Sequence, residues 1–275
     1  HKVVFCDCDP HTYTIHPEDA ARRVTSLTRA IMVVHLYGHP CDMDNILALA
    51  KKFNLFVIED CAQAHGAEYK GRRVGAIGDI GTFSFYPGKN LGAFGDAGAI
   101  VTNNDDLAKR CRMIANHGRA MKYAHEFEGR NSRLDGLQAA ILDVKLGHLD
   151  AWLAHRSMIA VYYNQHLENL AEITLPYQAE WAKHVWHLYV IRTQKRDLLL
   201  TYLQNNHIQI GIHYPIALPK QKAYGYLGQQ NEPMIANSYD EQILSLPIGE
   251  HLDTGDVESV ARTVKKFFNA TANNG

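Results

Sequence analysis

The sequence contains no uncharged apolar run of about 18 residues, the length that a membrane-spanning helix needs. It also has almost no net charge, because 28 Lys and Arg residues against 29 Asp and Glu residues leave −1. No overall field therefore attracts nucleic acid or an anionic membrane surface. No basic and then apolar leader opens the chain. We expect a cytoplasmic protein with neither a nucleic-acid nor a membrane partner.

Cysteine is scarce, and its five copies match neither a zinc pattern nor a disulfide framework. Reduced thiols in a cytoplasmic protein are the simplest interpretation. Histidine is common, with 16 copies, but its close pairs do not form a ligand set. His35 and His39 are four residues apart, but Gly38 and Pro40 argue against one helix face that presents both, and His184 and His187 have no carboxylate cluster beside them. We therefore expect no metal site.

The first half of the chain has the pattern of an α/β domain. Apolar runs at 31–35 and 55–58 flank a segment, 42–53, whose apolar residues recur at helical spacing. A strand, a helix and a strand in this order predict a βαβ unit and a parallel sheet. Further strands are expected at 82–86 and 97–102, with a helix at 104–116.

The pattern changes at residue 134. A long helical stretch with few helix-breaking residues is expected over 134–170. After it come strands around 185–192, a helix over 197–206, an extended segment at 211–215 and a last helix over 256–269. We expect a large domain over 1–150 and a smaller α+β domain over 151–275, joined by the long helix.

Polar residues stand where the predicted strands end, and open α/β sheets bind ligands at that edge. Asp60 ends an apolar strand, where a carboxylate is costly unless it meets a cation or several donors. A surface or helix-capping aspartate is the alternative. Lys89 lies in a loop with aromatic residues and glycine, where partial burial lowers the pKa of an amine and makes it nucleophilic. An ordinary solvated lysine is the alternative.

The glycines around Lys89 have the spacing of neither a phosphate-binding P-loop nor a dinucleotide fingerprint. A lysine with a carboxylate instead suits a cofactor that carries an aldehyde and a pyridine nitrogen. Ser84 and the glycine-rich turn supply donors for a phosphate. Gln63 stands three residues after Asp60, so a helical turn would place it on the same side, within reach of a ring hydroxyl.

Several separated motifs together resemble one protein family. They are the segments 34–38, 58–67, 78–79, 83–92, 95–99, 129–134, 138–140 and 211–215. This set is similar to the DegT/DnrJ/EryC1/StrS family of nucleotide-sugar aminotransferases that depend on pyridoxal 5'-phosphate. The resemblance implies an α/β fold like that of aspartate aminotransferase (fold type I), with a mostly parallel sheet in the large domain. It makes 1–150 a partial cofactor-binding domain.

The resemblance assigns a role to each matching residue. Lys89 matches the lysine that binds the cofactor covalently and carries the proton. Asp60 matches the partner of the pyridine nitrogen, and Gln63 matches the residue beside the ring oxygen. Ser84 matches a phosphate ligand. Asn131 matches a residue that reaches the cofactor phosphate of a neighbouring subunit, which implies a homodimer with shared active sites.

Three further positions match residues that line the sugar-nucleotide pocket in relatives, and a purely structural role is the alternative for each: Arg133, His213 and Tyr214. The implied reaction moves an amino group, from L-glutamate, to a keto group of a nucleotide-linked deoxysugar. The segments at 212–215 and 244–248 most resemble members that act on dTDP-linked 3-keto-6-deoxyhexoses.

Two other activities stay open. A sugar dehydratase of the same family replaces the lysine with histidine, so Lys89 argues against it. A non-catalytic regulator that binds the cofactor, or a truncated remnant, would keep the fold without turnover. A strand is expected at 2–7. The resemblance also implies that an amino-terminal part is missing before this strand, and in the family that part supplies a phosphate-binding turn. For a chain that begins at His1 we expect weak or no cofactor binding.

Overall fold

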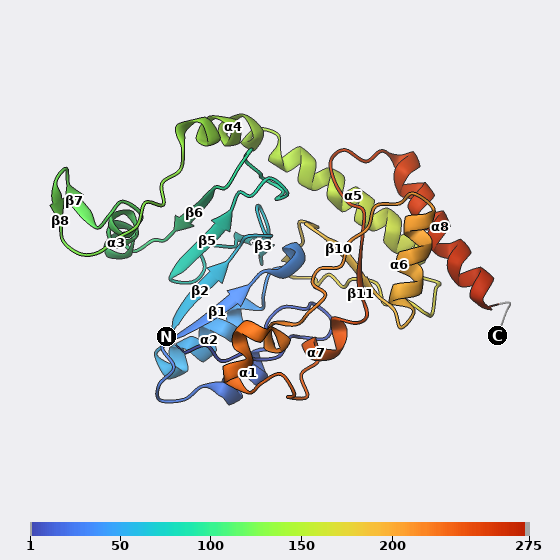
Figure 1. The fold of residues 1–275 in the computed structure, drawn as a ribbon, viewed down its shortest axis with the longest axis horizontal. Helices are drawn as coiled ribbons and strands as arrows, with labels where there is room; N and C mark the ends of the chain where they lie inside the picture. The colour runs from blue at the N-terminus through green and yellow to red at the C-terminus, as the bar shows by residue number, and fades with distance from the viewer. Residues whose placement is uncertain (1, 273–275) are drawn as a thin grey trace.

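The computed structural model describes residues 2–272 and is built around a four-stranded sheet (Figure 1). Its order is β1 (Ala30–Val34), β2 (Phe56–Asp60), β5 (Ile80–Ser84) and β6 (Gly98–Val101). The first three strands are parallel and β6 is antiparallel to β5. The mostly parallel α/β sheet expected from the sequence is therefore confirmed, and its three parallel strands end at one edge.

Helix α2 (Met43–Phe53) makes the crossover between β1 and β2. Asp42 begins it, because its side chain accepts a hydrogen bond from the N–H of Asn45. Asn54 ends it in the left-handed conformation, at φ 53°. Helix α1 (Pro17–Arg23) packs against α2. Helix α3 (Asp105–Ala115) starts in the same way, with the Asn104 side chain on the N–H of Leu107.

The two faces of the sheet differ. Alternate strand residues point to opposite faces, and Ile31, Val33 and Val57 are buried in one hydrophobic cluster with α2. Met32 and Phe56, on the other face, are about 60% exposed, at 59% and 60%. The apolar patterning of the strands thus serves a core on one side of the sheet only, within residues 2–272.

The prediction of one long helix over 134–170 is wrong. The structure has two helices, α4 (Gly136–Leu146) and α5 (Leu149–Leu167). The chain turns between them, where the N–H of His148 bonds to the carbonyl of Lys145 at 3.0 Å. Gly147 keeps right-handed helical dihedral angles there, at φ −62° and ψ −17°.

The second half of the chain forms its own hydrophobic cluster. Its elements are α5, β10 (Tyr189–Arg192), α6 (Arg196–Asn205), β11 (Ile243–Leu246) and α8 (Thr254–Ala272). The two clusters meet within α5, because Leu149 and Leu153 belong to the first and Ile159 and Leu167 to the second. The domain boundary at 150 and 151 stays a prediction, although both clusters include residues of α5.

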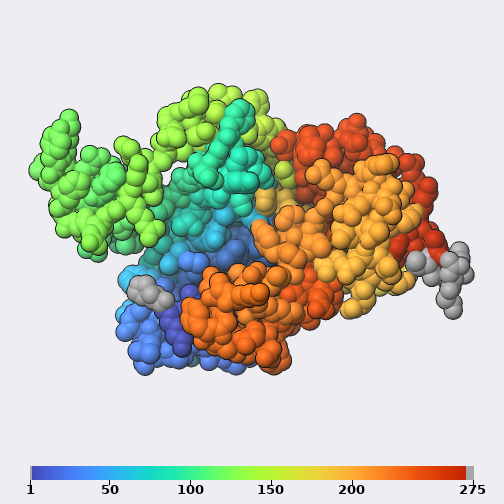
Figure 2. All heavy atoms as spheres, in the orientation of Figure 1, coloured from blue at the N-terminus to red at the C-terminus, as the bar shows by residue number. Residues whose placement is uncertain are grey.

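The strand expected at 2–7 is also wrong, because no neighbouring strand pairs with it. Polar groups of residues 2–7 instead form hydrogen bonds with a segment that lies far away in the sequence. The N–H of Phe5 bonds to the Gln229 side chain at 2.9 Å, and the Asp7 carboxylate accepts from the N–H of Ile235 at 2.7 Å. Figure 2 shows the orange segment that contains Gln229 lying beside the blue residues near the amino terminus.

The remaining elements are short. They are η1 (Leu36–Gly38), β3 (Glu68–Tyr69), β4 (Arg72–Arg73), β7 (Arg119–Met121), β8 (Ala124–His125), β9 (Ala182–Lys183), η2 (Leu218–Lys220), η3 (Lys222–Leu227) and α7 (Ala236–Tyr239). Among the described residues, no helix combines the length and the apolar character that crossing a membrane requires. All five cysteines are free thiols.

Candidate active site

The residues singled out at strand ends share one edge of the sheet. Asp60 ends β2 and Ser84 ends β5, and in the parallel pairing Asp60 stands opposite Thr82. Lys89 follows in the loop after β5, where its N–H bonds to the carbonyl of Tyr86 at 2.9 Å. The carboxyl ends of β2 and β5 therefore bring a carboxylate, a hydroxyl and an amine to the same place.

Lys89 is a half-buried amine beside a negative charge. Burial lowers the pKa of its ammonium group, and the charge of Asp60 offsets part of that effect. Asp60 itself accepts a hydrogen bond from the N–H of Ala62 at 2.9 Å, which fixes its carboxylate at the start of the next turn. The two groups thus lie within electrostatic reach of each other, with a larger fraction of free amine than an exposed lysine has.

Gln63 connects three segments of the site. Its Oε1 accepts from the N–H of Tyr37 at 2.7 Å, and its Nε2 donates to the hydroxyl of Tyr214 at 3.1 Å. The Tyr37 hydroxyl in turn donates to the backbone carbonyl of His213. These bonds hold His213 and Tyr214 against the turn that carries Gln63, so the structure brings all three predicted residues together.

His213 also lies close to Lys89. Its Nδ1 is 2.8 Å from the hydroxyl of Ser245 on β11. Burial lowers the pKa of His213, and the charge of Lys89 lowers it further. The sequence reasoning missed another histidine nearby: His65 is buried between Phe83 and Phe85, and burial lowers its pKa to about 4.

Ser84 keeps its hydroxyl at the sheet edge. Its Oγ accepts from the N–H of Tyr86 at 3.3 Å, within the turn that leads to Lys89. A hydroxyl that accepts this bond keeps its own hydrogen as a donor. The geometry therefore leaves Ser84 able to donate to an anion beside Lys89.

Asn131 and Arg133 are not brought to this edge. Both are exposed, and the Oδ1 of Asn131 accepts from Nε of Arg133 at 3.0 Å. Asn131 pairs its backbone with Asn116 in an isolated bridge beyond α3. Within residues 2–272, neither side chain forms a hydrogen bond or ion pair with Lys89 or Asp60. Their roles stay predictions, and the expectation for Asn131 already placed its partner on another subunit.

A buried hydrogen-bonded pair, Glu59 and His35, lies next to the edge. Glu59 is fully buried and accepts from His35 Nε2 at 3.1 Å and from the backbone N–H groups of Gly75, Ile77 and Gly78 at 2.6 to 2.8 Å. Burial alone would raise the pKa of Glu59, but the bonds from His35, Gly78 and Gly75 outweigh it and lower that pKa. Through these hydrogen bonds Glu59 holds the loop at 75–78 against β2, the strand that Asp60 ends.

The same pair lies next to Cys61, and the three side chains place ligand-type atoms within 4.8 Å of one another. The ring of His35 is already used on both sides, because Nδ1 accepts from the N–H of Cys41 at 2.9 Å. Its Nε2 therefore carries the proton that Glu59 accepts. Burial also raises the pKa of the Cys61 thiol. Hydrogen bonds within the chain therefore already use the side chains of His35 and Glu59.

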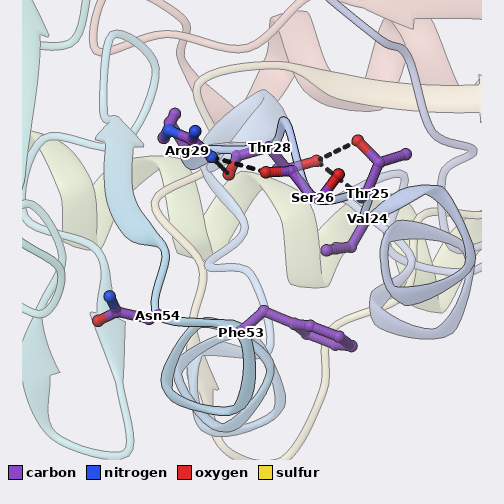
Figure 3. A pocket seen from close by; sticks show the side chains of 7 residues that line it. All are labelled: Val24, Thr25, Ser26, Thr28, Arg29, Phe53 and Asn54. Carbon is purple, nitrogen blue, oxygen red and sulfur yellow. Dashed lines mark hydrogen bonds between the residues drawn. The ribbon is translucent and has the colours of Figure 1, made fainter.

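A surface pocket of about 410 Å³ lies at the opposite edge of the sheet (Figure 3). It is lined by Val24, Thr25, Ser26, Thr28, Arg29, Phe53 and Asn54. These residues precede β1 and β2, whereas Asp60 ends β2. Arg29 is the one ionisable side chain in this lining, so the pocket offers no acid and base pair.

The donor set at the carboxyl edge fits pyridoxal 5'-phosphate. An amine with a lowered pKa suits an aldehyde, a carboxylate suits a protonated pyridine nitrogen, and a hydroxyl suits a phosphate. Lys89, Asp60 and Ser84 supply these groups. The sequence reasoning missed Tyr37 and Glu59, although both stand inside motifs it had singled out, because their contacts are made across the fold.

Comparison with known proteins gives close relatives over most of the chain. One is "dTDP-3-amino-3,6-dideoxy-alpha-D-galactopyranose transaminase" from Aneurinibacillus thermoaerophilus, 49% identical over 264 residues. The match covers 96% of this chain and 72% of the relative.

Two solved structures extend the likeness to the fold. DesV of Streptomyces venezuelae, solved in complex with a ketimine intermediate, superposes with a TM-score of 0.92 at 44% identity, covering 94% of this chain and 70% of that one. NtdA of Bacillus subtilis, solved with bound cofactor PMP, superposes with a TM-score of 0.88 at 31% identity, covering 97% and 62%. The profile of one family matches residues 1–265. The chain therefore belongs to the DegT/DnrJ/EryC1/StrS aminotransferase family.

Proposed function

We propose that the protein is a pyridoxal-phosphate-dependent aminotransferase that moves an amino group from L-glutamate to a dTDP-linked 3-keto-6-deoxyhexose. The observation that carries the proposal is the half-buried Lys89 amine, with its lowered pKa, beside the Asp60 carboxylate at the carboxyl edge of the sheet. Family membership supports the reaction class. The name of the Aneurinibacillus relative supports the nucleotide, the amination at carbon 3 and the deoxysugar.

When bound, the cofactor supplies a protonated pyridine ring that withdraws electrons from the carbon that loses its proton. Asp60 would keep the ring nitrogen protonated, because a carboxylate stabilises a neighbouring positive charge. Gln63 would hold the ring hydroxyl with the second hydrogen of its amide, since the first is donated to Tyr214. Ser84 would donate its hydroxyl to the phosphate.

Lys89 has two tasks in this proposal. Its lowered pKa makes the free amine available as a nucleophile. The same Nζ then holds a proton and returns it, which needs an amine that is not permanently charged at neutral pH. Partial burial serves both tasks, because it removes water that would otherwise stabilise the ammonium form.

The segment at 211–215 would contact the sugar nucleotide. His213 and Tyr214 are held beside Gln63 and Lys89, and Tyr214 is about half exposed, at 52%. A phenol in this position presents both an aromatic face and a hydroxyl to a sugar. Arg133 would act on the substrate from a second copy of the chain, as a cation for the diphosphate.

A homodimer with shared sites follows from the same proposal, with Asn131 completing the phosphate site of its partner. Mixing two inactive variants tests this sharing. A K89A chain and an N131A chain, refolded together, should recover up to about a quarter of the wild-type activity if each site takes Lys89 and Asn131 from different chains, and none if both come from one chain.

The reaction itself is tested with L-glutamate and a dTDP-3-keto-6-deoxyhexose, using the protein at its full natural length. We expect 2-oxoglutarate and an aminated sugar nucleotide in equal amounts by mass spectrometry. Borohydride reduction with pyridoxal phosphate should tag Lys89, and K89A should show neither tag nor product. A tag without product would favour a regulator, and a product that has lost water would favour a dehydratase.

A further inference from the structure

A chain of side-chain contacts links helix α5 to the residue that follows Lys89. At its centre is His187, in the segment 184–188 that leads into β10. Nδ1 of His187 lies 3.0 Å from Oδ1 of Asn90, and the two residues are 97 positions apart in the sequence. Because Asn90 follows Lys89 directly, this bond ties the loop of the reactive amine to the second half of the chain.

The second hydrogen bond of the Asn90 amide shows which atom is the donor between His187 and Asn90. Nδ2 of Asn90 donates to the carbonyl of Val185 at 3.0 Å, so Oδ1, which can only accept, faces His187. His187 must therefore carry its proton on Nδ1. Burial, and after it the charge of Lys89, hold the pKa of His187 well below its ordinary value, so the imidazole is neutral with a bare Nε2.

Two further residues, Arg156 and Gly38, restrain the backbone around His187. Nη1 of the buried Arg156, on α5, donates to the carbonyls of Trp186 and His187 at 3.2 and 3.4 Å. Gly38 packs against the same segment: a Cβ atom there would lie 2.8 Å from Cγ2 of Val185 and 3.1 Å from the backbone nitrogen of His187. The donor nitrogen therefore has little freedom to leave Asn90.

We propose that His187 is a positioning residue, which holds Lys89 half-buried at the carboxyl edge by donating its Nδ1 hydrogen to Asn90. The inference rests on the proposed function, in which Nζ of Lys89 is the reactive amine. Without the bond, the loop that carries Lys89 loses its tie to the 184–188 segment and water gains access to the amine. Hydration then favours the charged form and reduces the supply of nucleophile.

The test measures Lys89 without any cofactor. Competitive acylation, read by mass spectrometry across a range of pH, gives a profile that is normalised to its own plateau at high pH so that accessibility cancels. In H187L the midpoint should move upward, and the normalised labelling near pH 8 should fall about threefold. H187N keeps an N–H donor in place of Nδ1 and should restore the wild-type midpoint.

A matched control removes a histidine bond elsewhere in the chain, on the helix that carries Arg156. Nε2 of His155, on α5, lies 2.8 Å from the carbonyl of Leu252, and H155L should leave the profile of Lys89 unchanged. The double variant then shows whether His187 acts through Asn90. In an N90A background, H187L should cause no further movement of the midpoint.

Three results would overturn the inference: an unchanged midpoint in H187L, a full effect of H187L in the N90A background, or failure of H187N to restore the midpoint. Should H187L not fold, nitrogen-15 NMR of the wild-type protein decides, because a proton on Nε2 of His187 contradicts the donor assignment. The proposed function fails separately, when pyridoxal phosphate and borohydride leave Lys89 of the wild-type chain untagged.

Discussion

Two regions that carry predicted site residues are built in opposite ways. At the carboxyl edge of the sheet, Glu59 is fully buried with four hydrogen-bond donors, and Gln63 is bonded at both ends of its amide. The arm, residues 116–135 with β7 and β8, projects beyond α3 (Figures 1 and 2). There Met121 and Tyr123 are 73% and 82% exposed.

The contrast separates what one chain can complete from what it cannot. At the carboxyl edge, Glu59 and Gln63 are hydrogen-bonded within the chain, so their positions are set before any ligand arrives. The arm holds Asn131 and Arg133 without a contact to that edge, and its exposed apolar side chains are typical of a surface that packs against another molecule. The following predictions test this division.

The largest effect is expected at Asp60. D60N keeps the shape of the side chain but removes the charge that acts on Lys89 and would keep the cofactor nitrogen protonated. Transamination should fall by about 10³-fold, in the range of losing one aligned electrostatic group. D79N is the matched control, because Asp79 accepts from the N–H of Val57 at the other edge of the same sheet. A loss in D60N no larger than in D79N would contradict the assignment.

The next effect concerns stability. E59Q places an amide among donors from Gly75, Ile77 and Gly78, so at least one N–H loses its acceptor. Urea unfolding at neutral pH should show a loss of about 3 kcal/mol in the free energy of unfolding. E126Q, in the exposed arm, should change it by less than about 0.5 kcal/mol. Equal losses in the two variants would remove the distinction between edge and arm.

The third prediction concerns acid and His39, a buried histidine that packs against Trp181 and His184. Burial lowers the pKa of His39 from 6.5 to about 4, so below pH 6.5 the unfolded chain binds a proton that the folded chain does not. Stability is therefore lost as pH falls from 6.5 towards 4, by about 2 kcal/mol between pH 7 and 5 for this residue. H39Q should flatten the dependence of the unfolding free energy on pH by that amount, and an unchanged slope would contradict this account.

The smallest effect on stability is expected in the arm. Replacing Met121 and Tyr123 by serine should change the unfolding free energy of the monomeric chain by less than about 0.5 kcal/mol per residue, because both side chains are already exposed. The same double variant should dissociate at a higher protein concentration in sedimentation equilibrium. Unchanged self-association would show that the arm faces solvent in the assembled protein.

The sequence was sufficient for elements whose local signals agree with their burial. The helix at 42–53 has a cap at Asp42 and a regular apolar face, and the structure places α2 within one residue of that range. The strands before and after it were found because their apolar runs are bounded by turn residues. The candidate site was predicted from the same signals, since Asp60 ends β2 and Lys89 follows in the loop after β5, and its function stays a prediction.

Two kinds of feature could not be predicted from the sequence: where some elements break or fail to pair, and which distant residues make contact. The break at 147–148 went unseen because helical periodicity continues on both sides of it, and the strand at 2–7 was expected because an apolar run does not show whether a pairing strand exists. The contacts of Tyr37 and His187 join residues far apart in the chain. Such pairings are set by tertiary packing, which single residues and their spacing do not reveal.

Helix α5 has a mechanical consequence for the two halves of the chain. Its first turns are embedded in one core and its last turns in the other, and Arg156 between them donates to the carbonyls of Trp186 and His187. Because α5 is packed into both cores, the two halves of the chain cannot rotate about a hinge within it unless part of α5 leaves one of the cores. The segment 211–215 is held in the same way, by hydrogen bonds to Tyr37, Gln63 and Ser245.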